Sequence, residues 1–479
     1  LIIMLIIIYM RFILSDNMEL AHRFGKWHYS HDDGVRTWTN GERLCLYFGY
    51  SIDGDLEELI AGDPNNIKNA NGKFCVVMLW QDEMQVFVDY FCQTKVYYNT
   101  RNGLTVTNHL ALLPLTEHDI DHKSIKQFED GWNDDARLYA CKDSHNMEYM
   151  QKWNRFSSDG TVFHATSSIP QNCMLEHKGS THINRIHYTQ EDNLKAFETK
   201  LDWGTAQLED EIHRCMEQHS AVIKREYNNI CSSVSEGIDS TLQDQYFNAD
   251  TRIMYHPQGE GTLLELPPKQ KIIQQYRDKD LDIKFDVFDV RDVGSITSNN
   301  TIDPMLSYLD TVPTIWQVNQ LTSRPDIVMY GQCADEMFMH VPKFLLARVP
   351  PPHRNRYEDS YGGRKSPARA FTDPYNGVML DNWQMSFSHM AVPNLYNRDI
   401  ENQTGVQTAS LYADRRIFNL VHRVPADVQL SSMAHVRPQR NILHNHFRFP
   451  FATKQKDGAG YECRLVLKNL LTDTLNRVI

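Results

Sequence analysis

The chain has 479 residues, with 49 Lys and Arg against 61 Asp and Glu, which gives a formal charge of −12. A length of this order allows two or three domains at about 150 residues each, and the 41% hydrophobic content is ordinary for a globular protein. The acidic balance argues against a nucleic-acid-coating protein, which needs a basic face, and the composition excludes collagen, coiled coil, disorder and a multi-span membrane protein.

The cysteines and the first residues bear on the compartment. The nine cysteines are scattered, and no two form a Cys-x-x-Cys pair, which predicts reduced thiols in a cytoplasmic protein. The first ten residues are almost wholly apolar, but Arg11 ends this run well short of the ~20 residues that a membrane-spanning helix needs. We therefore expect no membrane anchor, and we interpret residues 1–9 as a non-native or disordered leader, with the true start at Met10 or Met4.

Residues 10–187 alternate short apolar segments with turn residues. Asn-Gly pairs at 71–72 and 102–103 mark turns between strands. The pattern predicts a first domain of antiparallel β-structure with one helix near 122–131. Examples of its predicted strands are 10–14, 43–50, 73–80, 84–91, 95–99 and 104–108.

Residues 190–479 follow a different pattern. Apolar residues recur at helical spacing over 191–220. After this helix, apolar strands alternate with helices, which predicts a parallel α/β sheet. The predicted strands are 227–234, 251–255, 283–288 and 326–330. From about 340 onward the sequence predicts mostly helix and loop.

A short polar loop, Ser235–Thr241 (SEGIDST), joins the strand that ends at Val234 to a helix expected to open at about 240. Backbone N–H groups and the positive end of the helix dipole together bind phosphate at such a place. Gly237 permits close backbone approach, Ser235 and Ser240 can donate hydroxyls, and Asp239 beside a phosphate indicates an intervening Mg²⁺. A strand-to-helix turn capped by Ser and Asp would give the same pattern.

A second strand, 326–330 (DIVMY), is followed by a Gly turn and an acidic pair in Gly331–Phe338 (GQCADEMF). In a parallel sheet both loops lie at the carboxyl edge, where ligands bind. Asp239 and Asp335 could then share one Mg²⁺ on a pyrophosphate. The alternative for Asp335 is a charge that stabilises a helix N-terminus.

These motifs resemble those of the asparagine synthetase family. Ser235–Ser240 is similar to the Ser-Gly-Gly-x-Asp-Ser motif of its ATP-pyrophosphatase domain, and Tyr330–Phe338 to its Ser-Gly-Glu-Gly-Ala-Asp-Glu-Leu-Phe motif. The resemblance extends over about 10–479, in the family's order. The other matching stretches are Gly72–Phe74, Val88-Asp89, Tyr97-Tyr98, Asp159–Phe163 with Ile169-Pro170, Gly405–Ile417 with Val424-Pro425, and Arg440–Leu443 with the residues that follow it.

The resemblance implies a two-domain α/β fold. Residues 10–187 would form a degenerate Ntn-type, glutaminase-like αββα domain. Residues 190–479 would form a parallel-sheet ATP-pyrophosphatase domain, of the adenine nucleotide α-hydrolase-like kind, with a helical C-terminal part. The family's glutaminase nucleophile is a Cys directly after the initiator Met, but Arg11 follows Met10, and Cys45 lies in a predicted core strand. We therefore expect no glutaminase activity.

The implied reaction is an ATP-dependent amide synthesis through an acyl-adenylate. Aspartate, ATP and ammonia would give asparagine, AMP and pyrophosphate, with ATP and Mg²⁺ as cofactors, no nucleic-acid or membrane partner, and a homodimer left open. Asp239 and Asp335 would bind Mg²⁺, and Lys454, with Lys456 as the alternative, would stabilise charge in the second step. By position, the ATP contacts are Val234, Ser235, Gly237, Asp239, Ser240, Met254, Tyr330 and Gly331.

Several residues depart from the family's pattern. Glu236 replaces the first Gly of the phosphate loop, Gln332 and Cys333 replace a Glu and a Gly, and Ala409 stands where the family has Arg. Three alternatives therefore stay open: a β-lactam synthetase or peptide-cyclase-like ligase on another acceptor, an inactive scaffold, and a tRNA-modifying enzyme, which the net charge disfavours. For His444 and His446 we expect solvated or hydrogen-bonded roles rather than a metal site, because they lie on different sides of a predicted helix.

Overall fold

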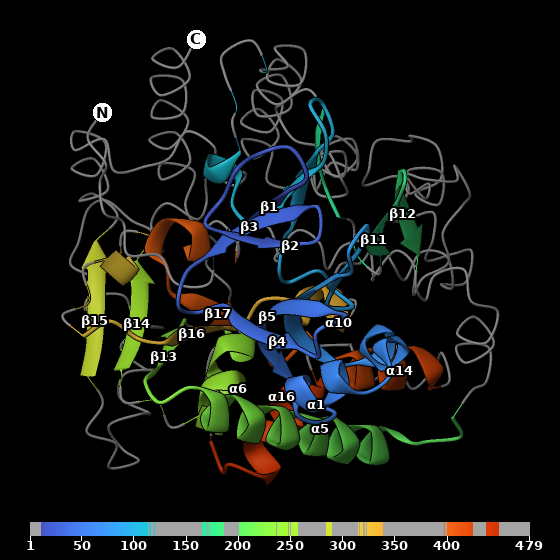
Figure 1. Ribbon diagram of the computed structural model, residues 1–479. Helices are drawn as coiled ribbons and strands as arrows, with labels where there is room; N and C mark the ends of the chain where they lie inside the picture. Colours follow the sequence, from blue (N-terminus) through green and yellow to red (C-terminus); the bar gives the residue numbers. More distant parts are fainter. Residues whose placement is uncertain are drawn as a thin grey trace, which may run out of the picture.

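In the residues that it describes, the computed structural model has three β-sheets with helices packed around them (Figure 1). Several predictions fall outside the described part of the chain: the leader (1–9), the helix near 122–131, the boundary at 187–190, Glu236, Lys454 and Lys456. That part comprises 11–113, 115, 119, 165–169, 171, 173–185, 201–235, 237–247, 249, 251–256, 284–289, 315, 317–319, 321, 323–338, 397, 400–424 and 437–449.

Residues 12–185 form two antiparallel sheets, as their alternating pattern predicts. The first has the order β10-β8-β9-β1-β3-β2 and the second β12-β11-β7-β6-β5-β4. The strands of the first sheet are β1 (Phe12–Ser15), β2 (His22–Phe24), β3 (Trp27–His31), β8 (Tyr97–Asn99), β9 (Thr105–Thr107) and β10 (Thr166–Ser168). Those of the second are β4 (Arg36–Thr39), β5 (Leu44–Ser51), β6 (Gly72–Leu79), β7 (Glu83–Val88), β11 (Cys173–Lys178) and β12 (Thr181–Arg185).

The two antiparallel sheets bury a common apolar core between them. Leu14 and Trp27 of the first sheet pack in one cluster with Val77 and Val86 of the second, which is the expected packing for two half-buried sheets. On its other face the second sheet packs against α1 (Leu56–Ala61) and the 3₁₀ helix η1 (Pro64–Asn69), which Asp55 and Asp63 cap. A further 3₁₀ turn, η2, spans Leu110–Leu112.

One predicted strand in this part ends early. The strand expected over 84–91 stops at Val88 because Asp89 begins a turn. The Asp89 carboxylate accepts hydrogen bonds from the backbone N–H groups of Gln93 (3.0 Å) and Thr94 (3.1 Å). Cys45 is fully buried in β5, as predicted, and the other cysteines within the described residues are also buried.

The third sheet is wholly parallel, which confirms the prediction for the second half of the chain. Its order is β15-β14-β13-β16-β17. Its strands are β13 (Ile230–Val234), β14 (Thr251–His256), β15 (Lys284–Asp289), β16 (Ile327–Tyr330) and β17 (Gln407–Ala409). β17 lies in a region predicted as helix and loop, so that prediction was wrong there: a buried three-residue strand is too short to show a period.

The helices of the second half are α5 (Thr205–Glu226), α6 (Ile238–Phe247), α10 (Ala334–Met337), α14 (Arg415–Arg423) and α16 (Arg437–Asn445). The helix predicted over 191–220 begins late among the described residues, because Leu201 is held in an extended segment by a hydrogen bond from its N–H to the carbonyl of Arg423 (2.8 Å). α5 then continues past 220 to Glu226. No helix in the described ranges is both long and apolar enough to cross a bilayer.

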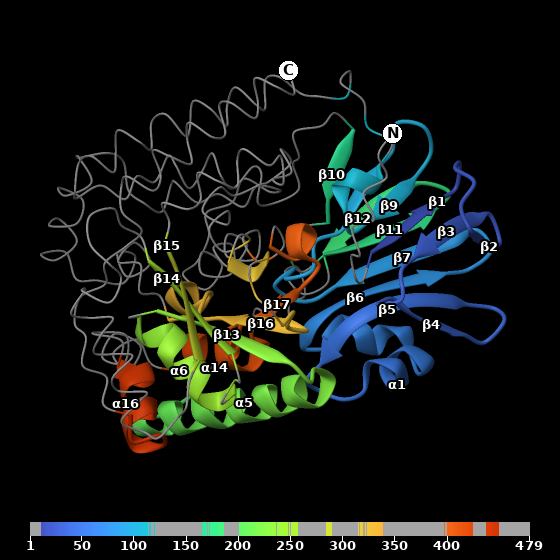
Figure 2. The same ribbon diagram turned by 90° about the vertical axis from the view of Figure 1, so that its left-hand side faces the viewer.

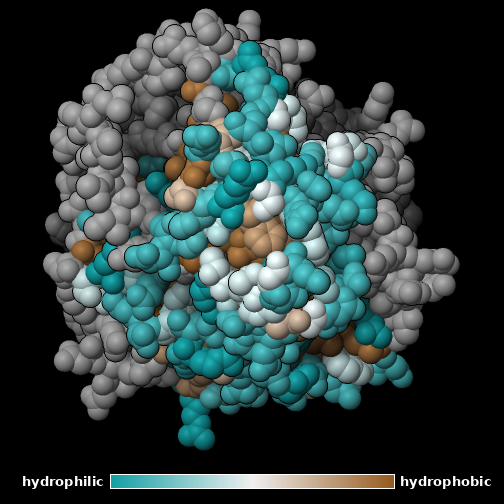
Figure 3. Space-filling model, viewed as in Figure 1, coloured by the Kyte–Doolittle hydropathy of each residue, from teal (hydrophilic) through white to brown (hydrophobic). Residues whose placement is uncertain are grey.

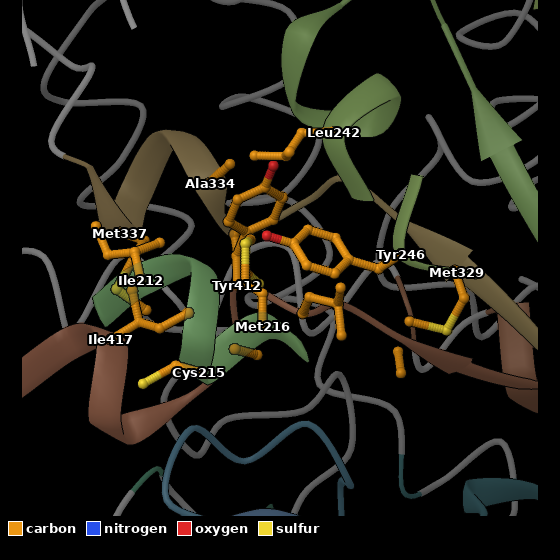
Figure 4. Close-up of a cluster of buried hydrophobic side chains, with 14 of the residues drawn as sticks. Ile212, Cys215, Met216, Leu242, Tyr246, Met329, Ala334, Met337, Tyr412 and Ile417 are labelled. Atoms are coloured by element: carbon orange, nitrogen blue, oxygen red, sulfur yellow. The ribbon is translucent and has the colours of Figure 1, made fainter. Parts of the chain in front are cut away.

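The helices and the two kinds of sheet meet in one large apolar core. Side chains of α5, α6, α14 and α16 pack against β13 and β16, and Figure 4 shows part of this cluster around Met216 and Tyr412. Tyr50 of β5 lies in the same cluster, so the antiparallel part packs directly on α5, the long helix at the bottom of Figure 2. The face drawn in Figure 3 is mainly hydrophilic over the described residues.

Candidate functional site

The order of the parallel sheet reverses between two of its strands. From β13 the chain adds β14 and β15 on one side, and then adds β16 and β17 on the other. The loops after β13 and β16 therefore leave a topological switch point in opposite directions, and such points form the ligand crevice of open α/β sheets. The two loops that the sequence singled out are these two.

The register of the strands places the predicted contacts along one edge. Val234, the last residue of β13, aligns with Met254 of β14, and Ser233 aligns with Tyr330, the last residue of β16. Val234 and Tyr330 are buried, and for Met254 the backbone position alone is described. All three lie at or near the carboxyl ends of neighbouring parallel strands, as a nucleotide crevice requires.

The loop between β13 and α6 is held by its own hydroxyls. Ser235 Oγ and Ser240 Oγ lie 2.8 Å apart, and the N–H of Ser235 donates to Ser240 Oγ (3.0 Å). The N–H of Gly237 donates to Ser235 Oγ (3.0 Å). Both serines, which the sequence predicts as phosphate donors, thus make hydrogen bonds within the loop that fix its conformation. The N–H groups of the first turn of α6 have no partner within the helix by construction, and they remain the natural phosphate donors.

The second loop packs against the first at Gly331. A Cβ placed on Gly331 would lie 2.4 Å from Ser240 N, 2.6 Å from Ser240 Cα and 2.8 Å from the Asp239 carbonyl carbon. Gly at this position is therefore a requirement of close backbone approach. Cys333, which stands where the family motif has Gly, adopts a left-handed conformation with φ of 70° at the start of α10.

Asp239 is held at two points that the sequence did not reveal. Its carbonyl accepts a hydrogen bond from Tyr412 Oη (2.9 Å), and its Oδ1 accepts one from Gln439 Nε2 of α16 (3.2 Å). The carboxylate is thus oriented at the carboxyl edge of the sheet. Carboxylate oxygens suit Mg²⁺, which usually takes one or two protein carboxylates together with phosphate oxygens and waters.

Asp335 occupies the second position of α10, directly after the turn that packs on Asp239 and Ser240; its side chain lies outside the described part. Within the described part, no group of three or more His, Cys, Asp or Glu side chains is arranged to hold a metal by itself. The carboxylate of Asp239 is compatible in its chemistry with a cation that shares its coordination with a phosphate.

The segment Ser410–Asp414, here called the 410–414 turn, contacts both loops and α6. Ser410 Oγ donates to the carbonyl of Gln332 (2.5 Å), and the N–H of Leu411 donates to Gln243 Oε1 (2.9 Å). In Figure 4 the Tyr412 hydroxyl points toward α6. The sequence showed 405–417 as a matching stretch, but the burial of these side chains, which gives them their roles, is not visible in a sequence.

The histidines singled out in the sequence behave as predicted. His444 is exposed in α16, while His446 follows the helix and stacks on His213 with ring centroids 3.7 Å apart. His446 Nε2 also lies 3.6 Å from a carboxylate oxygen of Asp210. The two residues face different neighbours, and they take no part in the candidate site.

A buried polar cluster adjoins the site where the antiparallel part meets α5. Tyr50 Oη bonds to His219 Nε2 (2.9 Å), and Arg416 donates from Nε and a terminal nitrogen to the Asp414 carboxylate (2.7–3.3 Å). Burial lowers the pKa of His219 to about 4, so this imidazole is neutral at pH 7. Burial acts to raise the pKa of Asp414, but its hydrogen bonds with Arg416 hold that pKa below the usual range.

Two buried groups give the stability opposite dependences on pH. The pKa of His219 is lowered on folding, so it removes stability as pH falls from about 6.5 toward 4. Burial raises the pKa of Asp89 to about 6, so Asp89 removes stability as pH rises from about 4 to 6. We expect the two effects to offset each other in the wild type. In His219→Gln, where the contribution of Asp89 is no longer offset, the urea midpoint is therefore expected to decrease as the pH rises from 4 to 6, compared with the wild type.

The matched variant is Asp89→Asn, whose midpoint is expected to rise over the same interval because His219 then acts alone. Urea titrations at half-unit steps of pH measure both slopes. Slopes of the same sign in the two variants would contradict the assignment.

No protein-family model matches this chain, and a search of curated proteins finds no significant match.

Proposed function

We propose that this protein is an ATP-dependent amide-forming ligase that acts through an acyl-adenylate, most similar in chemistry to asparagine synthetase. The observation that carries the proposal is the contact of Gly331 with Asp239 and Ser240 at the switch point of a parallel sheet. Two motifs about 90 residues apart, which resemble those of one family, pack closely there, since a Cβ on Gly331 would overlap the backbone of Ser240.

The finer fold assignment belongs to the same proposal. Two packed antiparallel sheets flanked by α1 are compatible with a degenerate Ntn-type glutaminase-like domain. The parallel order β15-β14-β13-β16-β17 is compatible with an ATP-pyrophosphatase domain. Cys45 is buried, and burial raises the pKa of its thiol, so Cys45 is not an exposed nucleophile.

In the proposed reaction a substrate carboxylate attacks the α-phosphorus of ATP, and pyrophosphate departs. The first turn of α6 would bind phosphate through its N–H groups, and Asp239, with Asp335, would hold Mg²⁺, which neutralises the charge of the leaving group when bound. Val234, Tyr330 and the backbone of Met254 would border the nucleotide. An amine then attacks the acyl carbon, and AMP leaves.

The direct test is ATP cleavage by the purified protein with Mg²⁺, aspartate and ammonium, with AMP resolved from ADP. We expect AMP, pyrophosphate and asparagine in equal amounts. AMP without asparagine would keep the adenylating ligase and reject aspartate or ammonia as the substrate. Failure to bind MgATP would reject the ligase and favour the inactive scaffold.

A ligase with another acceptor is the second candidate, and Gln332 favours it. Gln332 replaces the family's Glu, and its Oε1 is buried without a hydrogen-bond partner in the described part of the chain. A neutral amide oxygen accepts a hydrogen bond from an amine but takes up no proton at pH 7. A β-lactam synthetase or peptide-cyclase-like reaction would then show AMP release that depends on an amine-bearing acid rather than on ammonium.

Lys454 is the residue proposed to stabilise charge in the amide-forming step. Lys454→Ala is expected to lower amide formation by about 100-fold or more, because a pre-placed charge in a dry site contributes ~3–4 kcal/mol. Exchange of labelled pyrophosphate into ATP, which reports adenylation alone, is expected to persist. Lys456→Ala is the matched control. Full amide formation by Lys454→Ala would remove this lysine from the mechanism.

A further inference from the structure

One residue of the antiparallel part, Asn71, reaches the 410–414 turn. Asn71 is buried and directly precedes β6. Its Nδ2 donates to Asp414 Oδ1 (2.8 Å), and its Oδ1 accepts from the N–H of Arg415 (3.1 Å). The link joins residues that are far apart in the chain, one next to β6 in the antiparallel part and the others at the start of α14.

The backbone of Asn71 is fixed as firmly as its side chain. Its N–H donates to the Asp53 carboxylate (2.8 Å), and its carbonyl accepts from the N–H of Ile52 (2.7 Å). All four hydrogen-bonding groups of Asn71 are therefore in use, two toward the antiparallel part and two toward the start of α14. A fully satisfied buried polar residue of this kind sets the relative position of the elements it joins.

The 410–414 turn is built to transmit that position. The N–H of Ala413 donates to the carbonyl of Ser410 (3.2 Å), and the N–H of Tyr412 donates to Ser410 Oγ (3.2 Å). All five residues of the turn are completely buried. The ring of Tyr412 packs edge-on against Phe338, so the turn has no free volume in which to shift alone.

We propose that Asn71 is a positioning residue for the loop between β13 and α6, here called the nucleotide loop. Asn71 fixes Asp414, Asp414 fixes the 410–414 turn, and Tyr412 sets the carbonyl of Asp239 in the first turn of α6. This inference rests on the proposed function and deepens it: the antiparallel part serves to hold the nucleotide loop in its binding geometry.

A double-mutant cycle of Asn71→Ala and Tyr412→Phe tests this path of contacts, which runs from Asn71 through Asp414 and Tyr412 to the carbonyl of Asp239. Calorimetric titration with MgATP measures the dissociation constant of the full-length protein. Each single variant is expected to weaken binding about 3- to 10-fold, the equivalent of one buried hydrogen bond. The double variant is expected to have the same dissociation constant for MgATP as the single variant with the lower affinity, because both substitutions interrupt the same path of contacts. Effects that multiply would overturn the proposal.

The matched control is Asn65→Ala in η1, close to Asn71 in the chain. Asn65 is exposed, and its side chain bonds to Asp63, so MgATP binding is expected to be unchanged. If Asn71→Ala does not fold, Asn71→Leu takes its place, since it keeps the volume of the side chain and removes the donor to Asp414 without burying a second carboxylate.

Amide hydrogen exchange separates this inference from the proposed function. Asn71→Ala and Tyr412→Phe are expected to raise exchange at 238–241 and to leave 251–253 of β14 unchanged, whereas general destabilisation would raise both. If the wild type binds no MgATP, the proposed function fails, and local exchange at 238–241 still supports the positioning path. Unchanged exchange at 238–241 in both variants would overturn it.

Discussion

Gly331→Ala is expected to weaken MgATP binding by about 100-fold, which corresponds to the upper part of the ~1–3 kcal/mol cost of overpacking. The added methyl group would lie 2.4 Å from Ser240 N and 2.6 Å from Ser240 Cα. Both are backbone atoms of the nucleotide loop, which cannot rotate away as a flexible side chain can. The two loops must separate, and the first turn of α6 must move with them.

Two other glycines provide controls in the same calorimetric titration. Gly204→Ala adds a methyl group with no atom within 4 Å and is expected to bind MgATP as the wild type does. In Gly237→Ala the nearest atom is the side-chain oxygen of Ser235, at 3.0 Å, so we expect a smaller loss than for Gly331→Ala. Wild-type affinity in Gly331→Ala would place the nucleotide away from these loops.

Arg252→Met is expected to lower the free energy of unfolding by about 3–5 kcal/mol, the usual cost of removing one partner of a buried ion pair. Arg252 Nε lies 3.0 and 2.8 Å from the two carboxylate oxygens of Asp244, and the side chains are 3% and 0% exposed. The variant leaves the Asp244 charge buried beside an apolar group. Since Asp244 lies on α6, the loss is expected to loosen the helix that begins at the nucleotide loop.

The control for this prediction removes both charges. Asp244→Leu combined with Arg252→Met is expected to recover most of the lost stability, because no charge is then left unpaired. Lys178→Met breaks an exposed pair with Glu83 and is expected to leave the urea midpoint unchanged. An Arg252→Met variant with the wild-type midpoint would show that the pair does not form.

The sequence was sufficient for β13, β16 and the loops that follow them, because these are local patterns. The apolar runs of β13 and β16 and the glycines that follow them predict a parallel sheet with two polar loops at one edge, and the structure has both. The same reasoning failed for β17, whose three residues are a strand through their pairing with β16 alone. Its identity depends on a neighbour that no local pattern specifies.

The residues that hold the site were missed for a related reason. Tyr412, Gln439 and Asn71 come from three distant segments, and the side chain of each makes a hydrogen bond to a backbone or carboxylate atom. The sequence that flanks a single Asn or Gln does not show whether its side chain is buried and hydrogen-bonded or solvated. Tertiary packing alone makes that distinction.

The pairing of β13 with β16 has a consequence for biosynthesis. β13 obtains its neighbour β14 soon after it leaves the ribosome, but β16 follows about 100 residues later, which is a high-contact-order pairing. At ~5–20 residues per second, the nascent chain presents one unpaired edge of its central strand for about 5–20 s. During this interval the exposed edge of β13 can pair with a strand of another chain and cause aggregation. A chaperone that shields strand edges would therefore have its greatest effect before residue 327 is made.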